Sequence, residues 1–156
     1  MSLSPLQRSR LVAAARRAAR NAHAPYSRFR VGAAVLAGSG KTYAGGNVEN
    51  ASYGLACCAE RTAIFAAVSA GERRIAAVAV YTPTPRPVTP CGACRQVINE
   101  FGPRADIVCA CRSRERVETT LDRLLPGAFG PELLGSPARP PARRQRRAGA
   151  VTISQG

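Results

Sequence analysis

Two short cysteine clusters constrain the fold of this chain more than any other feature of its sequence. The first reads Cys58-Ala59-Glu60, and the second, which begins after 29 intervening residues, reads Pro90-Cys91-Gly92-Ala93-Cys94. Cys91 and Cys94 are one helical turn apart, so both thiolates can face one metal ion if a helix starts there. With Cys58 at the start of the preceding helix, three thiolates can fill three corners of a Zn²⁺ tetrahedron and leave the fourth corner open, as in catalytic zinc sites.

Glu60 and the two helix starts provide the chemistry that such a site needs. Unpaired amides and the helix dipole stabilise negative charge and so lower the pKa of a thiol at a helix N-terminus. Glu60 lies two residues after Cys58, close enough to take a proton from a water at the open metal position without being a ligand. The alternative is a structural Cys₄ zinc site whose fourth ligand would be Cys57, Cys109 or Cys111, but the C-x-E element at this separation favours the catalytic interpretation. These three cysteines are otherwise expected to be buried residues that only pack.

The rest of the pattern predicts strands that alternate with helices. Apolar spacing predicts helices at residues 5–22, 58–69 and 91–101 and strands at 31–36, 42–48, 75–81 and 106–111, followed by a short strand at 115–118 and a helical turn through 124–125. A turn at residues 38–41 makes the first two strands a hairpin, and four prolines make residues 82–90 a loop. Strands separated by helices predict a layered α/β sheet with a hairpin at its start.

Composition and charge limit the class of protein. At 156 residues and 46% hydrophobic, the chain is long enough for one domain with a single core. Its net charge of +14, carried almost entirely by arginine, suggests nucleic acid or an anionic membrane as a partner, although an Arg- and Ala-rich chain can also reflect a GC-rich genome. No apolar run approaches the roughly 18 residues of a membrane span, and no signal-peptide core is present. We therefore expect a cytoplasmic location and no membrane contact.

The end of the sequence differs from the rest in composition. Residues 136–156 hold five arginines, three prolines and no acidic residue. Such a segment is poor in large apolar residues, so we expect a solvated, disordered tail that follows a folded domain of residues 1–135. Any contact with nucleic acid is expected through this tail.

Five blocks of the sequence resemble, in order, the small homotetrameric cytidine deaminases whose zinc ligands are three cysteines. The two cysteine clusters match a signature of zinc nucleobase deaminases, H-x-E followed by P-C-x-x-C, with Cys in place of His. The other blocks resemble the family's PYSxFxVGAA, GxNxENxSYG and LLPxxFxP segments, and the similarity runs from about residue 5 to residue 134. The blocks are residues 26–34, 46–54, 58–63, 90–97 and 124–131.

This resemblance implies a three-layer α/β/α fold with a mixed sheet of about five strands and an N-terminal β-hairpin. It also implies that Cys58, Cys91 and Cys94 bind Zn²⁺ and that Glu60 carries protons. The reaction would be the hydrolytic deamination of cytidine and 2′-deoxycytidine to uridine and 2′-deoxyuridine, with release of ammonia, a step of pyrimidine salvage. Arg61 would hydrogen-bond the ligand sulfurs and offset the negative charge of three thiolates on one Zn²⁺.

The resemblance also assigns the substrate contacts. Asn47 and Glu49 match the side chains that hold the ribose 3′-OH, and as alternate residues at a strand end they would point the same way. Phe29 matches the aromatic ring that packs on the pyrimidine. Tyr53 falls in the substrate segment, and Ala59 would offer backbone groups to the polar edge of the base.

Phe129 resembles a C-terminal aromatic residue that reaches the active site of a neighbouring subunit, so the active unit is expected to be a homotetramer. A site that grips a free 3′-OH favours nucleosides over RNA or DNA, in which the internal 3′ oxygens are esterified. Three alternatives stay open: a deaminase of a modified nucleoside or nucleoside antibiotic, a basic nucleic-acid-binding or editing deaminase, and a structural zinc protein.

Overall fold

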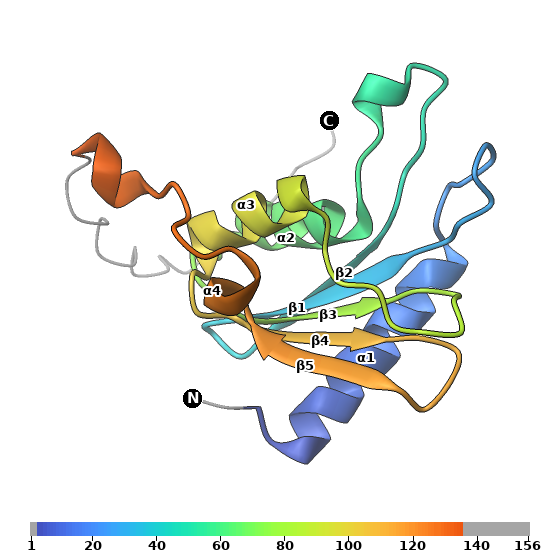
Figure 1. Cartoon of the computed structure of the whole chain (residues 1–156), viewed down its shortest axis with the longest axis horizontal. Helices are drawn as coiled ribbons and strands as arrows, with labels where there is room; N and C mark the ends of the chain where they lie inside the picture. Colours follow the sequence, from blue (N-terminus) through green and yellow to red (C-terminus); the bar gives the residue numbers. More distant parts are fainter. Residues whose placement is uncertain (1–2, 136–156) are drawn as a thin grey trace, which may run out of the picture.

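A five-stranded mixed sheet lies between two layers of helices in the computed structural model, which describes residues 3–135 (Figure 1). The strands are β1 (Gly32–Ala37), β2 (Thr42–Gly46), β3 (Ile75–Tyr81), β4 (Asp106–Ala110) and β5 (Arg116–Thr120). The helices are α1 (Pro5–Arg20), α2 (Ala59–Ser69), α3 (Gly92–Phe101) and α4 (Leu121–Leu124), with short 3₁₀ turns at Tyr53–Leu55 and Pro131–Leu134. The strand order is β2-β1-β3-β4-β5, in which β3 and β4 are parallel and the other neighbours are antiparallel.

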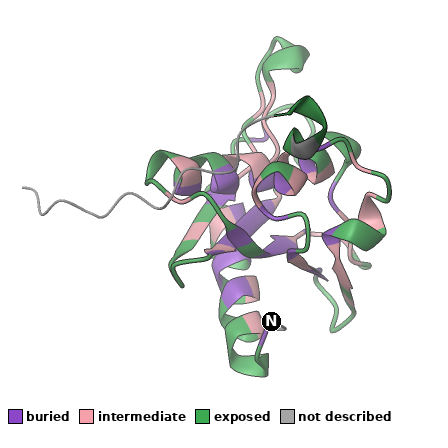
Figure 2. Ribbon diagram, turned by 90° about the vertical axis from the view of Figure 1, so that its left-hand side faces the viewer, coloured by how far each residue is buried: buried purple, intermediate pink, exposed green. Residues whose placement is uncertain are grey.

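The two faces of the sheet carry separate apolar cores. α1 packs on one face, where Leu11 and Ala34 belong to one cluster of buried side chains. α2 and α3 pack on the other face, around a larger cluster that includes Ile64, Ile98 and Ile107. Figure 2 shows the buried residues concentrated in the strands and in the parts of the helices next to them. The three-layer α/β/α arrangement that the family resemblance implies is therefore confirmed.

Glycines allow the helices to approach the sheet closely at two places. A Cβ atom on Gly32 would overlap the carbonyl oxygen of Ala15 in α1. A Cβ atom on Gly45 would lie 2.7 Å from Cγ2 of Thr62 and 2.8 Å from the amide nitrogen of Ala63. The first turns of α2 therefore rest directly on the backbone of β2, which holds the start of this helix in place.

The register of the sheet brings the starts of α2 and α3 to one edge. Gly32 pairs with both Gly46 and Tyr81, and Tyr81 pairs with Ala110, so β2, β3 and β4 all end at this edge. The chain leaves the edge after β2 on its way to α2, and after β3 on its way to α3. Both helices lie on the same face of the sheet (Figure 1), so the topology places the two cysteine clusters near each other.

The predicted α/β order is confirmed, and several elements match the expectation closely. The strand expected at residues 75–81 spans Ile75–Tyr81, residues 82–90 contain no helix or strand, and the first helix ends at Arg20 rather than at residue 22. Among the described residues, no helix combines the length and the apolar character needed to cross a bilayer. The tail expected at residues 136–156 lies outside the described residues.

The second strand is shorter than predicted. It ends at Gly46 instead of residue 48. Val48 instead forms isolated bridges with His23 and with Cys57. The backbone nitrogen of Asn47 still donates to the carbonyl of Val31, the residue before β1, but Val48 and Glu49 pair with segments outside the sheet.

Candidate metal centre and adjoining pocket

Three cysteine side chains converge where α2 and α3 begin. Cys58 is the N-cap of α2, Cys91 is the N-cap of α3, and Cys94 lies in the first turn of α3. The three Sγ atoms all lie within 4.8 Å of one another, and those of Cys58 and Cys91 are 4.0 Å apart. Tetrahedral thiolates about 2.3 Å from a zinc ion are about 3.8 Å from each other, so this donor set fits Zn²⁺.

The exposure of the three thiols suits an open metal site. Cys94 is buried, Cys58 is half-buried and Cys91 is exposed. Neither N-cap residue uses its side chain for a capping hydrogen bond, so both Sγ atoms remain available as ligands. The cluster therefore has one side closed by protein and one side open to solvent, as a catalytic metal site requires.

The remaining cysteines lie outside this cluster. In the part of the chain that the structure describes, the group of side chains close enough to share a metal ion contains only the three cysteines just named. Cys109 and Cys111 are fully buried, as expected. Cys57 is half-buried rather than buried, and its Sγ accepts a 3.7 Å hydrogen bond from the hydroxyl of Thr62. Residues 3–135 thus bring no fourth cysteine to the cluster, which a structural Cys₄ site needs.

Arg61 brings positive charge to the cluster from the first turns of α2. Its Nη2 atom donates a 3.7 Å hydrogen bond to Sγ of Cys58 and a 3.0 Å hydrogen bond to the carbonyl of Ala56. A hydrogen bond from the Cys94 thiol, together with the Arg61 guanidinium, lowers the pKa of Cys58 to about 5. The same contact with Cys58, together with burial, raises the pKa of Cys94. Arg61 therefore contacts the sulfur of Cys58, one of the three clustered cysteines.

Glu60 is a buried carboxyl group at the start of α2. Only 5% of its surface is exposed. Burial raises its pKa, and the negative charge of Cys58 raises it further. A carboxyl group whose pKa moves toward neutrality is well suited to accept a proton and return it. Glu60 and Thr82 are the buried polar or charged residues among those described, so burial of this carboxyl group is exceptional in the molecule.

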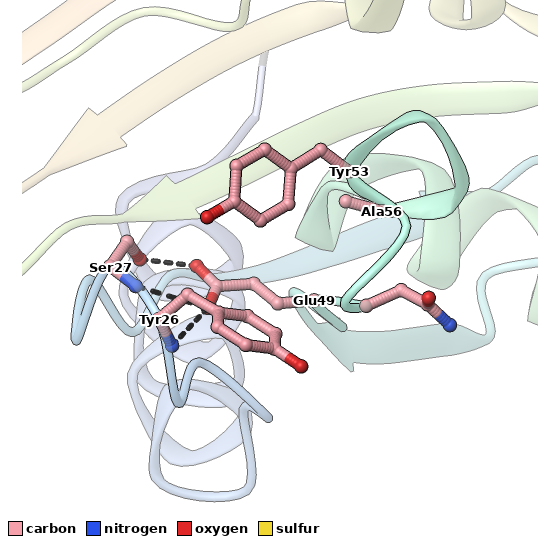
Figure 3. A pocket seen from close by; sticks show the side chains of 6 residues that line it. Tyr26, Ser27, Glu49, Tyr53 and Ala56 are labelled. Atoms are coloured by element: carbon pink, nitrogen blue, oxygen red, sulfur yellow. Dashed lines mark hydrogen bonds between the residues drawn. The ribbon is translucent and has the colours of Figure 1, made fainter.

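A cavity of about 350 Å³ lies among the loops that follow α1 and precede α2 (Figure 3). Its lining consists of Tyr26, Ser27, Glu49, Asn50, Tyr53 and Ala56. The rings of Tyr26 and Tyr53 stand edge to face with their centroids 5.9 Å apart. Ala56 links the cavity to the metal centre, because its carbonyl accepts the hydrogen bond from Arg61. The three clustered cysteines and Glu60 are not part of the lining.

Glu49 braces one wall of this cavity. Its carboxylate accepts hydrogen bonds from the backbone nitrogens of Tyr26, at 2.9 Å, and Ser27, at 3.2 Å, and from the Ser27 hydroxyl (Figure 3). The hydrogen bond from the Ser27 hydroxyl is the main reason that the pKa of Glu49 is lowered. Glu49 is therefore held as a carboxylate whose position is set by the loop it contacts.

Asn47 holds the next part of the same loop. Its Oδ1 accepts a 2.8 Å hydrogen bond from the backbone nitrogen of Val31, and its Nδ2 donates a 3.0 Å hydrogen bond to the carbonyl of Phe29. The prediction that Asn47 and Glu49 are alternate residues of a strand end is wrong, since β2 ends at Gly46. Both side chains instead bind the segment of residues 26–31.

The other predicted contact residues differ in exposure. Phe29 is 39% exposed and Tyr53 is 76% exposed, so neither ring is a core residue. Ala59, the first residue of α2, is fully buried. Phe129, which follows α4, is 57% exposed. Of the predicted substrate contacts, Glu49 and Tyr53 line the cavity.

Three polar side chains of α3 make contacts that the sequence did not reveal. Arg95 hydrogen-bonds groups around the start of its helix and the carbonyl of Leu124. Gln96 and Asn99 both donate to the carbonyl of Phe129. These partners in the C-terminal segment lie about 30 residues away in sequence, so no local pattern identifies them. Their position soon after the C-x-x-C pair is the only signal that the sequence offers.

Comparison with known proteins gives these residues a family context. Residues 6–111 match the family described as "Cytidine and deoxycytidylate deaminase zinc-binding region". The chain is 49% identical over 128 residues to the cytidine deaminase of Halalkalibacterium halodurans, and the aligned region covers 81% of this chain and 97% of that protein. It is 44% identical over 116 residues to the cytidine deaminase of Mycobacterium tuberculosis, and this alignment covers 74% of this chain and 84% of that protein.

Solved structures agree with this comparison. The crystal structure of cytidine deaminase from Burkholderia pseudomallei superposes with a TM-score of 0.75 at 49% sequence identity, covering 78% of this chain and 98% of that chain. The crystal structure of cytidine deaminase from Mycobacterium tuberculosis superposes with a TM-score of 0.66 at 40% identity, covering 78% and 96% of the two chains. The similarity in sequence thus extends to the arrangement of the helices and strands.

Proposed function

The chain belongs to the cytidine and deoxycytidylate deaminase family, and we propose that it hydrolyses cytidine and 2′-deoxycytidine to uridine and 2′-deoxyuridine, with release of ammonia. The observation that carries this proposal is that three thiols converge at two helix starts and that the buried carboxyl group of Glu60 lies beside them, in hydrogen-bond contact with Cys94. A purely structural zinc site has no need for a buried carboxyl group with a raised pKa. The arrangement therefore favours a metal-dependent enzyme.

Cys58, Cys91 and Cys94 would hold the zinc ion. The spacing of their sulfur atoms and the exposure of Cys91 support this assignment. When bound, zinc supplies a Lewis acid that makes water a better nucleophile near neutral pH. Three thiolates weaken that effect by their negative charge, and the contact of Arg61 with Cys58 would offset part of the charge.

Glu60 would move the protons of the reaction. A water oxygen forms a bond to C4 of cytosine. Glu60 takes the proton that this water loses and delivers it to N3. Glu60 then takes the proton of the new hydroxyl group and delivers it to the amino group. The C4–N bond breaks, ammonia leaves, and the product carries a carbonyl at C4 and a proton at N3. The burial of Glu60 supports this function, because it limits competing proton exchange with bulk water.

The substrate would contact a wall built around residues 26–31. We assign Phe29, Asn47, Glu49, Tyr53 and Ala59 to substrate binding. Asn47 and Glu49 both hydrogen-bond the segment that carries Phe29, so these three residues form one braced unit. A braced unit meets a ligand with little loss of conformational freedom, which favours binding of a small nucleoside.

We extend the proposal to the assembly and the location of the enzyme. Tyr53, Leu55 and Phe129 expose 76%, 70% and 57% of their surfaces, and large exposed apolar side chains are typical of surfaces that contact another chain. The active unit would be a homotetramer in the cytoplasm, in which Phe129 reaches the site of a neighbouring copy. Residues 1–135 would form the catalytic domain, and residues 136–156 would be a tail outside it.

A substrate panel tests the proposed activity. The zinc-loaded protein is incubated with cytidine, 2′-deoxycytidine, CMP and a short cytosine-containing oligonucleotide, while ammonia release and the loss of cytosine absorbance are measured. We expect turnover of both nucleosides and none of the oligonucleotide. Glu60→Gln should retain zinc but lower kcat by about 10²- to 10⁴-fold, because it removes the proton carrier.

Other outcomes would indicate other classes of protein. Turnover of the oligonucleotide alone would indicate an editing deaminase. Turnover of a modified nucleoside added to the panel, without turnover of cytidine or 2′-deoxycytidine, would indicate an enzyme of another nucleoside class. Bound zinc without ammonia release from any substrate would indicate a structural zinc protein. Full activity in Glu60→Gln would contradict the assignment of Glu60.

A further inference from the structure

Arg95 ties the C-terminal segment to the start of α3. Its Nε donates a 2.7 Å hydrogen bond to the carbonyl of Pro90, and its Nη2 donates a 3.0 Å hydrogen bond to Oγ1 of Thr89. Its Nη1 donates a 2.9 Å hydrogen bond to the carbonyl of Leu124. One guanidinium group thus joins the residues just before Cys91 to the end of α4.

Gln96 and Asn99 provide a second attachment further along the same helix. Nε2 of Gln96 donates a 2.8 Å hydrogen bond to the carbonyl of Phe129, and Nδ2 of Asn99 donates a 3.2 Å hydrogen bond to the same oxygen. A carbonyl oxygen has two lone pairs and can accept both bonds. Two side-chain amides from α3 therefore hold one backbone group of the C-terminal segment.

The backbone and the ring of Phe129 are held differently. The ring is 57% exposed, so its own burial does not determine where it points. Between the two attachments, Gly127 adopts a φ of +64°, a left-handed conformation that favours glycine and reverses the chain locally. The segment from Leu124 to Phe129 is thus fastened to α3 at both ends through carbonyl groups, while its aromatic side chain stays free to contact something else.

We propose that Gln96 and Asn99 are positioning residues, which hold the backbone of Phe129 so that its exposed ring projects in one direction toward the site of a neighbouring copy. The inference rests on the proposed function and adds to it what fixes the ring in place. Two of the clustered cysteines lie at the start of α3. The same helix therefore carries both the candidate metal ligands and the side chains that hold the backbone of Phe129. Arg95 fastens the base of the same segment to the residues before Cys91.

Replacing both amides by apolar side chains tests this proposal. In the double variant Gln96→Leu/Asn99→Leu, the carbonyl of Phe129 loses both donors. We expect KM for cytidine to rise about tenfold, because the loss of two hydrogen bonds is large enough to account for a change of this size. The values of kcat, zinc content and Tm should stay near those of the wild type. Hydrogen–deuterium exchange of residues 124–130 should become faster in the zinc-loaded double variant.

Two further variants separate positioning from general stability. Glu100→Leu is the matched control, because the side chain of Glu100 is exposed on the same helix and makes no hydrogen bond or ion pair among the described residues. This variant should change neither KM nor exchange. Phe129→Ala should raise KM by itself. Adding it to the double variant should raise KM no further than Phe129→Ala alone, because the amides act through the ring.

The outcomes are distinguishable. Unchanged exchange at residues 124–130, an unchanged KM, or a loss that adds to that of Phe129→Ala would each overturn the positioning of Phe129 by these amides. A fall in Tm and zinc content with no change in KM would show that the amides only stabilise the fold. A wild-type protein without activity on cytidine would overturn the proposed function itself, and with it this inference.

Discussion

The cysteines of this molecule lie in two regions with opposite surroundings. Cys58 and Cys91 cap the starts of α2 and α3, whereas Cys109 lies in β4 with no exposed surface. In the first region, hydrogen bonds from Cys94 and Arg61 lower the pKa of Cys58 to about 5. In the second region, burial raises the pKa of Cys109 to about 12.

The difference shows that the groups around a cysteine decide its chemistry: side-chain donors stabilise the Cys58 thiolate, whereas burial keeps Cys109 a neutral thiol. A helix start offers unpaired amides that stabilise a thiolate and leaves room for a metal ion. A strand inside a sheet has its amides paired with its neighbours, so a cysteine there packs as a small apolar side chain.

Removing one thiol from each region should give the largest difference. Cys94→Ser should abolish zinc binding and deaminase activity, because a serine hydroxyl does not ionise near neutral pH and cannot replace a thiolate ligand. Cys109→Ala should keep one zinc ion per chain and nearly full activity. Atomic absorption after dialysis, followed by an ammonia assay, measures both properties. Loss of zinc from Cys109→Ala would show that the two regions are not separate.

Removing the positive charge beside the cluster should have the next largest effect. Arg61→Ala should retain zinc but lower kcat by about 10- to 100-fold, because the charge of the three thiolates is no longer offset. Arg10→Ala is a suitable control, since Arg10 is exposed on α1, which packs on the opposite face of the sheet. An unchanged kcat in zinc-replete Arg61→Ala would contradict this function of the guanidinium group.

In the metal-free protein, replacing a cysteine by serine should lower the free energy of unfolding more at the buried Cys109 than at the exposed Cys91. Cys109→Ser should lower the free energy of unfolding by about 1–3 kcal/mol, because it places a hydroxyl group in a buried apolar site. The same change at the exposed Cys91 should stay within about 0.5 kcal/mol of the wild type. Urea unfolding of both variants without metal measures the two values. Equal costs at the two positions would argue against the difference in surroundings.

The smallest effect is expected from alkaline pH. Cys109 keeps its proton up to a pKa of about 12 in the folded protein, whereas a cysteine in the unfolded chain ionises near 9.0. Above pH 9 the unfolded state therefore holds fewer protons than the folded state, and stability falls as pH rises. By pH 10 the wild type should have lost about 1 kcal/mol more than Cys109→Ala, measured relative to pH 8. Parallel stability curves for the two proteins would show that burial does not hold this proton.

Sequence reasoning succeeded where the determinants are local. A continuous apolar run predicted β3 with its observed bounds, because a strand covered on both faces needs apolar residues at almost every position. The C-x-x-C pair predicted a helix start at Cys91, since two residues one turn apart face the same way on a helix. The same reasoning placed Cys58 at the start of α2 and brought the three donors together.

The hydrogen-bond partners of several polar side chains could not be predicted, because these partners lie far away in the sequence. Asn47 and Glu49 were expected on a strand end, but they bind a loop that lies 16 to 23 residues earlier in the chain. Gln96 and Asn99 bind a carbonyl that lies 33 and 30 residues later. An amide or carboxylate can pair with any group of the right geometry, so its residue type alone does not identify its partner.

Local sequence patterns therefore predicted the helix starts, the three clustered cysteines and the layered α/β order, because helix-end chemistry and apolar periodicity operate within a few residues. Tertiary packing was needed to show that Cys57 stays outside the cysteine cluster, that side chains beyond the end of β2 brace residues 26–31, and that α3 holds the C-terminal segment. These features depend on the sheet register and on loops that bring distant segments together. A hydrogen bond forms between such segments only after the fold has placed donor and acceptor within about 3 Å of each other.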